Sequence, residues 1–163
     1  MTFLPGTPRG LWAAFGVFVG LNLVFLAVMQ GYGFVIIDEM WEPAAVAAHV
    51  EAMSNQQRTA HAWLTGTADV AYPFAYAALF GGLAVRAFPD HEWLAFPILL
   101  CVPVDLIEVL SQVMILTGAD MDPWLAVKSI ATPIKLVLFV AGVLIGLTAL
   151  FVLWRRRRAR RAA

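Results

Sequence analysis

Charged side chains are scarce in this sequence, at 13% of its residues. Soluble globular domains carry about 25%, and much of the charge here lies in one run of arginines near the end of the chain. Hydrophobic residues make up 61%. A bundle of helices buried in lipid explains both values, whereas an ordinary soluble domain explains neither. We therefore expect one all-α, polytopic membrane domain over residues 1–163.

Cysteine and recognisable catalytic motifs are also nearly missing. Cys101 is the only cysteine, so the chain forms no intrachain disulfide, and the count does not indicate a redox compartment. We find no nucleotide-binding loop, zinc motif, haem-attachment motif or nucleophile motif. The sequence therefore predicts no metal site and no cofactor, and it leaves open whether the protein is an enzyme.

Four apolar stretches are long enough to cross a bilayer, which takes about 20 helical residues. We place them at about 11–30, 67–88, 95–117 and 129–153. A polar segment, 31–66, separates the first two; in it Pro43 suits the start of a short helix and Ser54 with Gln57 forms a capping box. The first span is longer than the apolar part of a signal peptide, so we expect it to be retained. The prediction is a four-transmembrane-helix bundle with a short extracytoplasmic helical segment between helices 1 and 2.

Positive charge is unevenly distributed between the two sides of these spans. Eight cationic residues fall on one side and two on the other, namely Arg9, Arg86 and the six arginines of the tail 154–163 against Arg58 and Lys128. Lys and Arg near span ends favour the cytoplasmic side. We therefore expect both termini in the cytoplasm and the loops 31–66 and 118–128 outside. The basic tail then contacts anionic lipid rather than nucleic acid.

The third span carries ionisable groups at a depth where they are costly. Cys101, Asp105, Glu108 and Gln112 stand at i, i+4, i+7 and i+11, so a helix places all of them on one face. A carboxylate at the bilayer centre costs about 2.5–3.5 kcal/mol on insertion scales. The pair of acids in this span therefore needs partners, water, protonation or a ligand.

The other spans carry polar groups at a similar depth, in the outer half of the bilayer. These groups are Asn22 in the first span, Asp69, Tyr72 and Tyr76 in the second, and Lys135 in the fourth. A proline near the charged residue of each of the last three spans (Pro73, Pro103 and Pro133) frees a backbone carbonyl. We interpret the set as an outward-facing polar pocket or network. The alternative is a salt bridge between Lys135 and one acid that only fixes helix register.

The balance of charge in this set favours chemistry at the acids. Three carboxylates facing one lysine cannot all be comfortably ionised in a low-dielectric site. Asp105 or Glu108 would then be a proton carrier or a general acid, or the pair would bind a cation.

Small residues and histidines have simpler interpretations. Small residues let helices approach closely in lipid, so we expect helix contacts along three sets: Ala13, Gly16, Gly20 and Ala27; Ala71, Ala75, Ala78 and Gly82; and Gly142 with Gly146. The same faces permit a homodimer. We interpret His49 and His61 as solvated residues rather than a metal pair, and Asp90, His91 and Glu92 as solvated residues of a turn.

The segments Asp69-Val-Ala-Tyr-Pro-Phe-Ala-Tyr76 and Asp105-Leu-Ile-Glu108 resemble motifs in a group of small four-span bacterial integral membrane proteins of uncharacterised function. Those proteins show D-x-x-[FY]-P-x-x-Y in span two and D-x-x-E in span three. The second motif is often followed by Asn, where this chain has Val109. The resemblance implies a four-span protein of the bacterial cytoplasmic (inner) membrane and a role for these positions, but no activity.

Three classes of function follow from these observations. The protein binds a small or lipidic ligand from the outer side, or acts as a partner subunit. Alternatively it is an intramembrane enzyme that uses Asp105 and Glu108 as proton-transfer groups on a lipid or isoprenoid substrate. A further alternative is a proton-coupled or cation-coupled carrier, which at 163 residues would act as a dimer. We favour the first class.

Overall fold

The computed structural model describes residues 4–162, and all of the regular structure in that range is helical. The helices are α1 (Pro8–Tyr32), α2 (Pro43–Ala52), α3 (Asn55–Leu64), η1 (Thr65–Asp69), α4 (Val70–Tyr76), η2 (Ala77–Gly81), α5 (Gly82–Ala87), η3 (Glu92–Ala95), α6 (Phe96–Leu116) and α7 (Met121–Ala162). Four stretches are long and apolar enough to cross a membrane: Pro8–Tyr32, Asn55–Ala87, Glu92–Leu116 and Met121–Arg161. The predicted all-α bundle with four candidate spans is confirmed to this extent.

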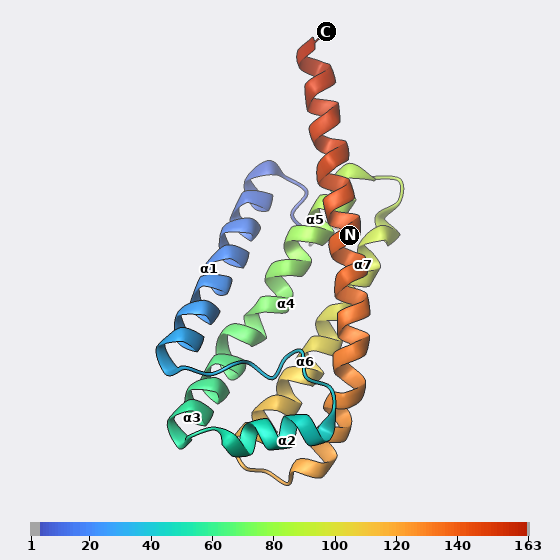
Figure 1. Ribbon diagram of the computed structural model, residues 1–163. Coiled ribbons are helices and arrows are strands. Elements are labelled where there is room, and N and C mark those ends of the chain that lie inside the picture. Colours follow the sequence, from blue (N-terminus) through green and yellow to red (C-terminus); the bar gives the residue numbers. More distant parts are fainter. Residues whose placement is uncertain (1–3, 163) are drawn as a thin grey trace.

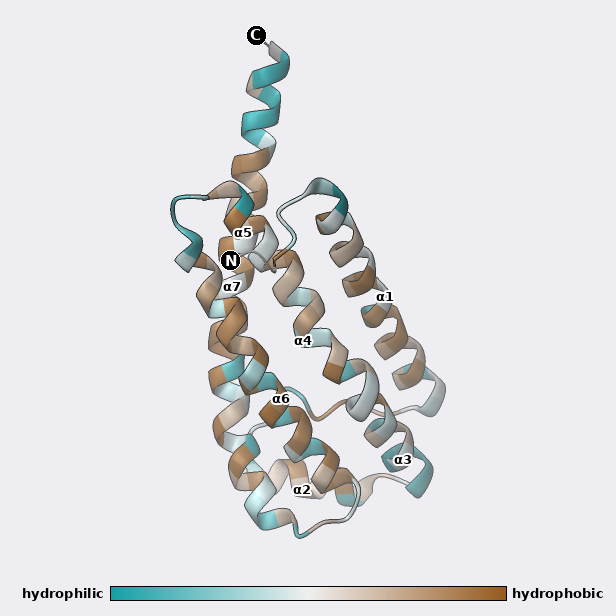
Figure 2. Ribbon diagram, turned by 180° about the vertical axis from the view of Figure 1, so that it is seen from behind, coloured by the Kyte–Doolittle hydropathy of each residue, from teal (hydrophilic) through white to brown (hydrophobic). Residues whose placement is uncertain are grey.

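Figure 1 shows these four stretches side by side, with α2 lying across one end of the bundle. The last turns of α7 project from the opposite end and carry the run of arginines. We refer to the two as the α2 end and the arginine end. Large apolar side chains lie exposed on the outside of the bundle, among them Trp12, Leu23, Val137 and Leu144. In Figure 2 the hydrophobic colour predominates along α1 and on the part of α7 next to the arginine run, whereas α4 and α6 also carry pale and hydrophilic segments.

The second candidate span is one continuous helical stretch with two π-helical segments, η1 and η2. It begins at the predicted capping box, in which Ser54 Oγ accepts from Gln57 N (3.2 Å) and Gln57 Oε1 accepts from Ser54 N (3.0 Å). The segment η1 ends at Asp69, four residues before Pro73. Because proline has no N–H, the Asp69 carbonyl loses its ordinary α-helical donor. The irregular backbone thus falls at one of the candidate site residues.

The fourth candidate span packs closely against both the third and the second through small residues of α7. A Cβ atom on Gly142 would lie 2.6 Å from Cβ of Ile98, and one on Gly146 would lie 2.6 Å from Cδ1 of Phe80. The predicted contact at this glycine pair is therefore confirmed, and it is formed within the chain. The helix α7 starts at Met121, well before the predicted start of the fourth span, and continues without a break into the arginine run.

The expected close contact along α1 is wrong. Ala13, Gly16, Gly20 and Ala27 all face outward, and no described residue comes within 4 Å of a Cβ built on Gly16 or Gly20. The helix instead packs through aromatic rings, since Phe18 stacks on Tyr72 with ring centroids 5.4 Å apart. The close approach to α1 comes from the facing helix instead, where a Cβ atom on Gly82 of α5 would lie 2.9 Å from Cδ2 of Leu11. A homodimer through these small residues stays a prediction.

Candidate functional site: a buried charge network

A loop residue closes the α2 end of the bundle. The segment 33–42 runs from α1 to α2 across that end (Figure 1), and its Ile37 is fully buried in an apolar cluster with Val46 and Ile115. This anchor brings Asp38 to the helices: its Oδ1 accepts from Gln112 Nε2 (2.8 Å). Sequence reasoning placed Asp38 only in an outer polar segment and did not nominate it.

Lys135 of α7 lies at the centre of the ion pairs. Its Nζ is 3.4 Å from Asp38 Oδ2 and 3.4 Å from Asp105 Oδ1, and it also pairs closely with Glu108 Oε2. The predicted salt bridge between Lys135 and an acid is present, but one lysine is shared by three carboxylates. These contacts join the loop, α6 and α7, so the network fixes their relative positions.

Glu108 has both of its oxygens occupied. Its Oε1 accepts from Lys128 Nζ (2.8 Å) and, in a short hydrogen bond, from Thr132 Oγ1, while Oε2 faces Lys135. Lys128 is fully buried and also donates to Thr132 Oγ1 (3.1 Å). A fully paired, fully buried carboxylate positions its neighbours and has no free oxygen for substrate.

The placement of Lys128 in an outer loop is therefore wrong. Because α7 begins at Met121, Lys128 lies about two turns inside a helix. Lys128, Thr132 and Lys135 stand at i, i+4 and i+7, the same spacing that identified the polar face of α6. Pro123, in the first turn of α7, was the available indication of the earlier start.

The predicted polar face of α6 is confirmed as buried. Cys101, Glu108 and Gln112 are 0% exposed and Asp105 is 3% exposed. The Tyr76 hydroxyl donates to Asp105 Oδ2 (2.9 Å) and also lies 3.1 Å from Cys101 Sγ. Tyr76 thus meets a buried acceptor, as its depth suggested.

Asp69 is buried beside this network but is not paired with it. The residue is 2% exposed, and no hydrogen bond or ion pair between described residues 4–162 includes its carboxylate. Its electrostatic neighbours are Asp38, Asp105, Glu108 and Lys135, of which only the last is positive. Its oxygens are not among the fully enclosed polar atoms that lack a partner, so a positive or hydrogen-bonding group can approach them, and such a group would stabilise the carboxylate.

Tyr72 and Asn22 form the edge of the site. The Tyr72 hydroxyl lies 3.4 Å from Asn22 Oδ1, while Asn22 Nδ2 donates to the Phe18 carbonyl (2.7 Å) and the residue is exposed. Tyr72 packs edge-on against Tyr76, with ring centroids 5.7 Å apart. The structure therefore brings the other nominated residues together and leaves Asn22 at the periphery, linked only through Tyr72.

The interpretation of the histidines as solvated is wrong for His61, and His49 is tied to the loop. His61 is 0% exposed because the loop covers it, and its ring stacks on Phe34 with centroids 4.9 Å apart. Neither of its ring nitrogens has a hydrogen-bond partner among residues 4–162. His49 Nε2 lies 3.1 Å from the Val35 carbonyl. Over the same described range, no three His, Cys, Asp or Glu side chains are arranged to hold a metal ion.

The network contains more negative than positive groups. Four carboxylates (Asp38, Asp69, Asp105 and Glu108) face two lysines, Lys128 and Lys135. Burial alone would raise the pKa of Asp38, but Lys135, the hydrogen bond from Gln112 and Lys128 together lower that pKa below its ordinary value of 3.8. Asp38 is thus held as the anion. The surplus carboxylate is Asp69, with which no lysine of residues 4–162 forms an ion pair.

The segment 33–42 covers the charge network. The outward-opening pocket that was expected at the α2 end of the bundle is therefore closed by this segment. A cavity of about 590 Å³ lies between α1 and α3, and one of about 250 Å³ lies beside Trp63 and Val113. Neither cavity is lined by a charged residue of the network. The carboxylates are therefore packed against their partners beneath the segment 33–42. Comparisons of the chain with protein families, with curated proteins and with solved structures find no match.

Proposed function

We propose that this protein binds a small or lipidic ligand that carries a cationic group, which the buried carboxylates hold in the half of the bundle nearer α2. The observation that carries the proposal is Asp69. Its buried carboxylate has no partner among residues 4–162, and three other carboxylates interact with it electrostatically. An ammonium group beside Asp69 would supply both the missing charge and the missing hydrogen bond. A neutral ligand would leave that requirement unmet.

The uneven distribution of arginine and lysine supports an orientation for this site. We infer both termini in the cytoplasm of a bacterial inner membrane, with the α2 end outside. The ligand would then approach from the outer side, where the segment 33–42 covers the network. Displacing Asp38 from Gln112 and Lys135 would uncover the remaining carboxylates, so we infer that this loop opens on binding.

Intramembrane proton transfer is the second candidate, and one contact favours it. The Tyr76 hydroxyl lies between Asp105 Oδ2 (2.9 Å) and Cys101 Sγ (3.1 Å), which places two groups that carry exchangeable protons beside a carboxylate. Glu108 does not fit this role, because two lysines and Thr132 occupy its oxygens. Binding is favoured over catalysis because Asp105 is already paired with Tyr76 and Lys135, whereas Asp69 has no partner among residues 4–162.

Mass spectrometry of the molecules retained by the gently purified protein tests the proposal. The wild type is compared with Asp69→Asn, which keeps the shape of the side chain, and with Asp90→Asn, which changes an exposed turn residue. We expect an amine-containing molecule in the wild type and in Asp90→Asn, and its loss from folded Asp69→Asn. Retention of the same molecules by all three proteins would overturn the assignment, as would the retention of nothing by the wild type.

A further inference from the structure

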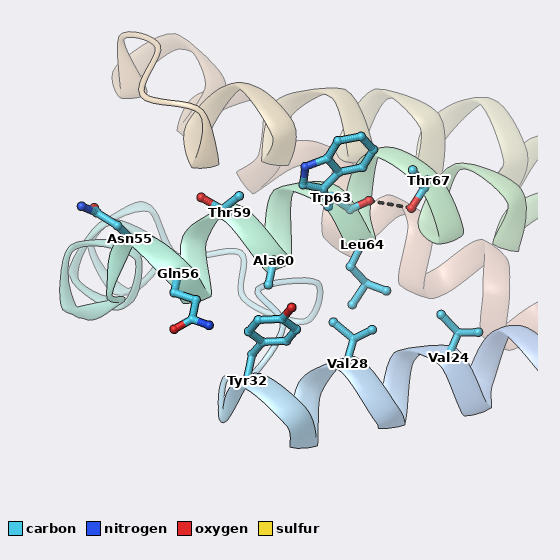
Figure 3. Close-up of a pocket in the computed structure, with 10 residues that line it drawn as sticks. All are labelled: Val24, Val28, Tyr32, Asn55, Gln56, Thr59, Ala60, Trp63, Leu64 and Thr67. Carbon is cyan, nitrogen blue, oxygen red and sulfur yellow. Dashed lines mark hydrogen bonds between the residues drawn. The ribbon is translucent and has the colours of Figure 1, made fainter.

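A second site lies away from the charge network, in the groove of about 590 Å³ between α1 and the stretch α3–η1 (Figure 3). Ligand sites in proteins commonly measure about 300–1,000 Å³. One wall is formed by α1 with Val24, Val28 and Tyr32, and the other by residues between Asn55 and Thr67. No residue of the charge network lines it, so the groove and the network are separate sites.

The polarity of the groove changes along its length. Val24, Val28 and Leu64 line the part deeper in the bundle, whereas Asn55, Gln56 and Thr59 line the part nearer the α2 end (Figure 3). From Val24 to Tyr32 the helix rises by about 12 Å. Tyr32 and the 70% exposed Trp63 flank this transition, and such aromatic residues are enriched where acyl chains meet headgroups. The groove therefore spans the boundary between the apolar and polar layers of one leaflet.

The polar groups of the groove suit uncharged ester and hydroxyl groups. No Asp, Glu, Lys, Arg or His lines it. Within the described part of the chain the side chains of Asn55, Gln56 and Thr59 make no hydrogen bond, so they are free to contact a ligand. Thr67 is different, because its hydroxyl donates to the Trp63 carbonyl (2.6 Å, dashed in Figure 3). Thr67 thus adds no free donor to the deeper, apolar part.

The two walls are joined at the α2 end. Gln57 Nε2 donates to the carbonyls of Tyr32 (3.2 Å) and Gly33 (2.8 Å), which ties the end of α1 to the first turn of α3. This link sets the width of the groove at its polar end before any ligand arrives. When a groove is already formed, less conformational free energy is lost in ordering its walls as a ligand binds.

We propose that this groove binds one phospholipid of the leaflet at the α2 end. Its glycerol-ester region lies against Asn55, Gln56 and Thr59, and one acyl chain follows Val24, Val28 and Leu64. The charged headgroup extends past the groove, which has no charged side chain to bind it. This assignment rests on the change from apolar to polar lining at one membrane depth and does not depend on the ligand proposed for Asp69.

Photo-crosslinking in vesicles tests it. The protein is reconstituted in phosphatidylethanolamine and phosphatidylglycerol that contain a phosphatidylethanolamine with a photoactivatable group on one acyl chain, and the labelled residues are mapped by mass spectrometry. We expect labelling of the wild type to concentrate on Val24, Val28 and Leu64. Equal labelling of Leu23, which is 60% exposed on another side of α1, would overturn the proposal, because it would indicate only the lipid that surrounds any span.

A matched pair of variants adds a second readout. Val28→Trp fills the groove, whereas Leu23→Trp places the same bulk on the outward side of the same helix. We expect crosslinking in the groove to fall about tenfold in Val28→Trp, because the added side chain occupies the contact surface, and to stay unchanged in Leu23→Trp. An unchanged yield in folded Val28→Trp would count against the site. The wild-type labelling pattern decides the question even where Val28→Trp does not fold.

Discussion

Asp38 and Lys135 are 97 residues apart in the sequence, yet Asp38 Oδ2 lies 3.4 Å from Lys135 Nζ. The pair connects the irregular segment between α1 and α2 to the longest helix of the bundle. It is the least buried ion pair of the charge network among residues 4–162, with side chains 20% and 15% exposed. The cover over the network is thus held by its most solvent-accessible contact, while the carboxylates of Asp105 and Glu108 beneath it are at most 4% exposed.

Removing the charge of Asp38 should loosen this cover. Asp38→Asn keeps an oxygen for Gln112 but loses the ion pair with Lys135, so we expect the free energy of unfolding to fall by about 1 kcal/mol. Thermal unfolding in detergent measures the change. Glu39→Gln, at the exposed neighbouring position, is the control and should have almost no effect. An equal loss in both variants would contradict a specific contact by Asp38.

The contribution of Asp38 should depend on pH in one direction. Its pKa is lowered in the folded state, so the anion stabilises the protein in full above the ordinary pKa of 3.8. As the pH falls from 3.8 to the lower folded-state pKa, the unfolded chain binds a proton at this carboxyl that the folded protein does not, so stability is lost. We therefore expect the stability difference between wild type and Asp38→Asn to be constant at neutral pH and to shrink in acid. A difference that grows on acidification would have the wrong sign.

Glu108 should be the residue least tolerant of neutralisation. Glu108→Gln leaves Lys128 and Lys135 buried with a weakened counter-charge, and breaking one partner of a buried pair costs about 3–5 kcal/mol. Glu51→Gln, at an exposed position of α2, is the matched control. The double variant Glu108→Gln/Lys128→Met should recover part of the loss, since it removes one uncompensated ammonium group. No recovery in the double-variant cycle would show that Lys128 and Glu108 are not coupled.

Asp69→Asn should have the opposite effect on stability. The substitution removes a buried carboxylate that has no hydrogen bond among residues 4–162. We expect the free energy of unfolding to rise, because the neutral amide avoids the repulsion that the carboxylate meets from Asp38, Asp105 and Glu108. The measurement uses protein freed of retained small molecules, because a bound ligand would stabilise the wild type. A large destabilisation would mean that Asp69 is paired in the folded protein.

The glycines of α7 and α1 should differ in their tolerance of a methyl group. In Gly142→Ala the new Cβ would meet Ile98 Cβ at 2.6 Å, so we expect a loss of about 1–3 kcal/mol. In Gly16→Ala no atom of residues 4–162 lies within 4 Å of the new Cβ. The lower flexibility of alanine should therefore raise the free energy of unfolding by about 0.5–1 kcal/mol. Unfolding of the two variants in detergent is the comparison. Destabilisation by Gly16→Ala would indicate that this face of α1 contacts a second chain.

Local periodicity is what made much of the fold and site predictable. The capping box at Ser54 and the spacing of Asp105, Glu108 and Gln112 each depend on residues within a few turns of one helix. Asp38 could not be found in this way, since its position depends on Ile37 packing into a cluster formed by α2, α6 and α7. No sequence periodicity links a residue of an irregular segment to a helical residue 97 positions later.

Three other misplacements have equally physical causes. Lys128 was assigned to a loop because hydropathy identifies the lipid-buried part of a helix and not its start, and α7 begins before its apolar part does. The contact face of α1 was misassigned because small residues permit a close approach without requiring one. Phe18 and Tyr72 supply a larger contact surface on the other side of the helix. His61 became buried only because the loop that carries Phe34 folds over it.

Because α7 is continuous, the arginine end and the lysines of the charge network belong to the same helix. Its 42 residues extend about 63 Å, roughly twice the 30 Å hydrocarbon core of a bilayer. Lys128 and Lys135 lie on the same helix as the arginines, and Arg156 Nη1 donates a hydrogen bond to the Ala87 carbonyl (2.9 Å). The side chains that position the buried acids and those that form the basic tail are thus carried by a single helix, so a displacement of α7 as a whole would change the network and the tail together.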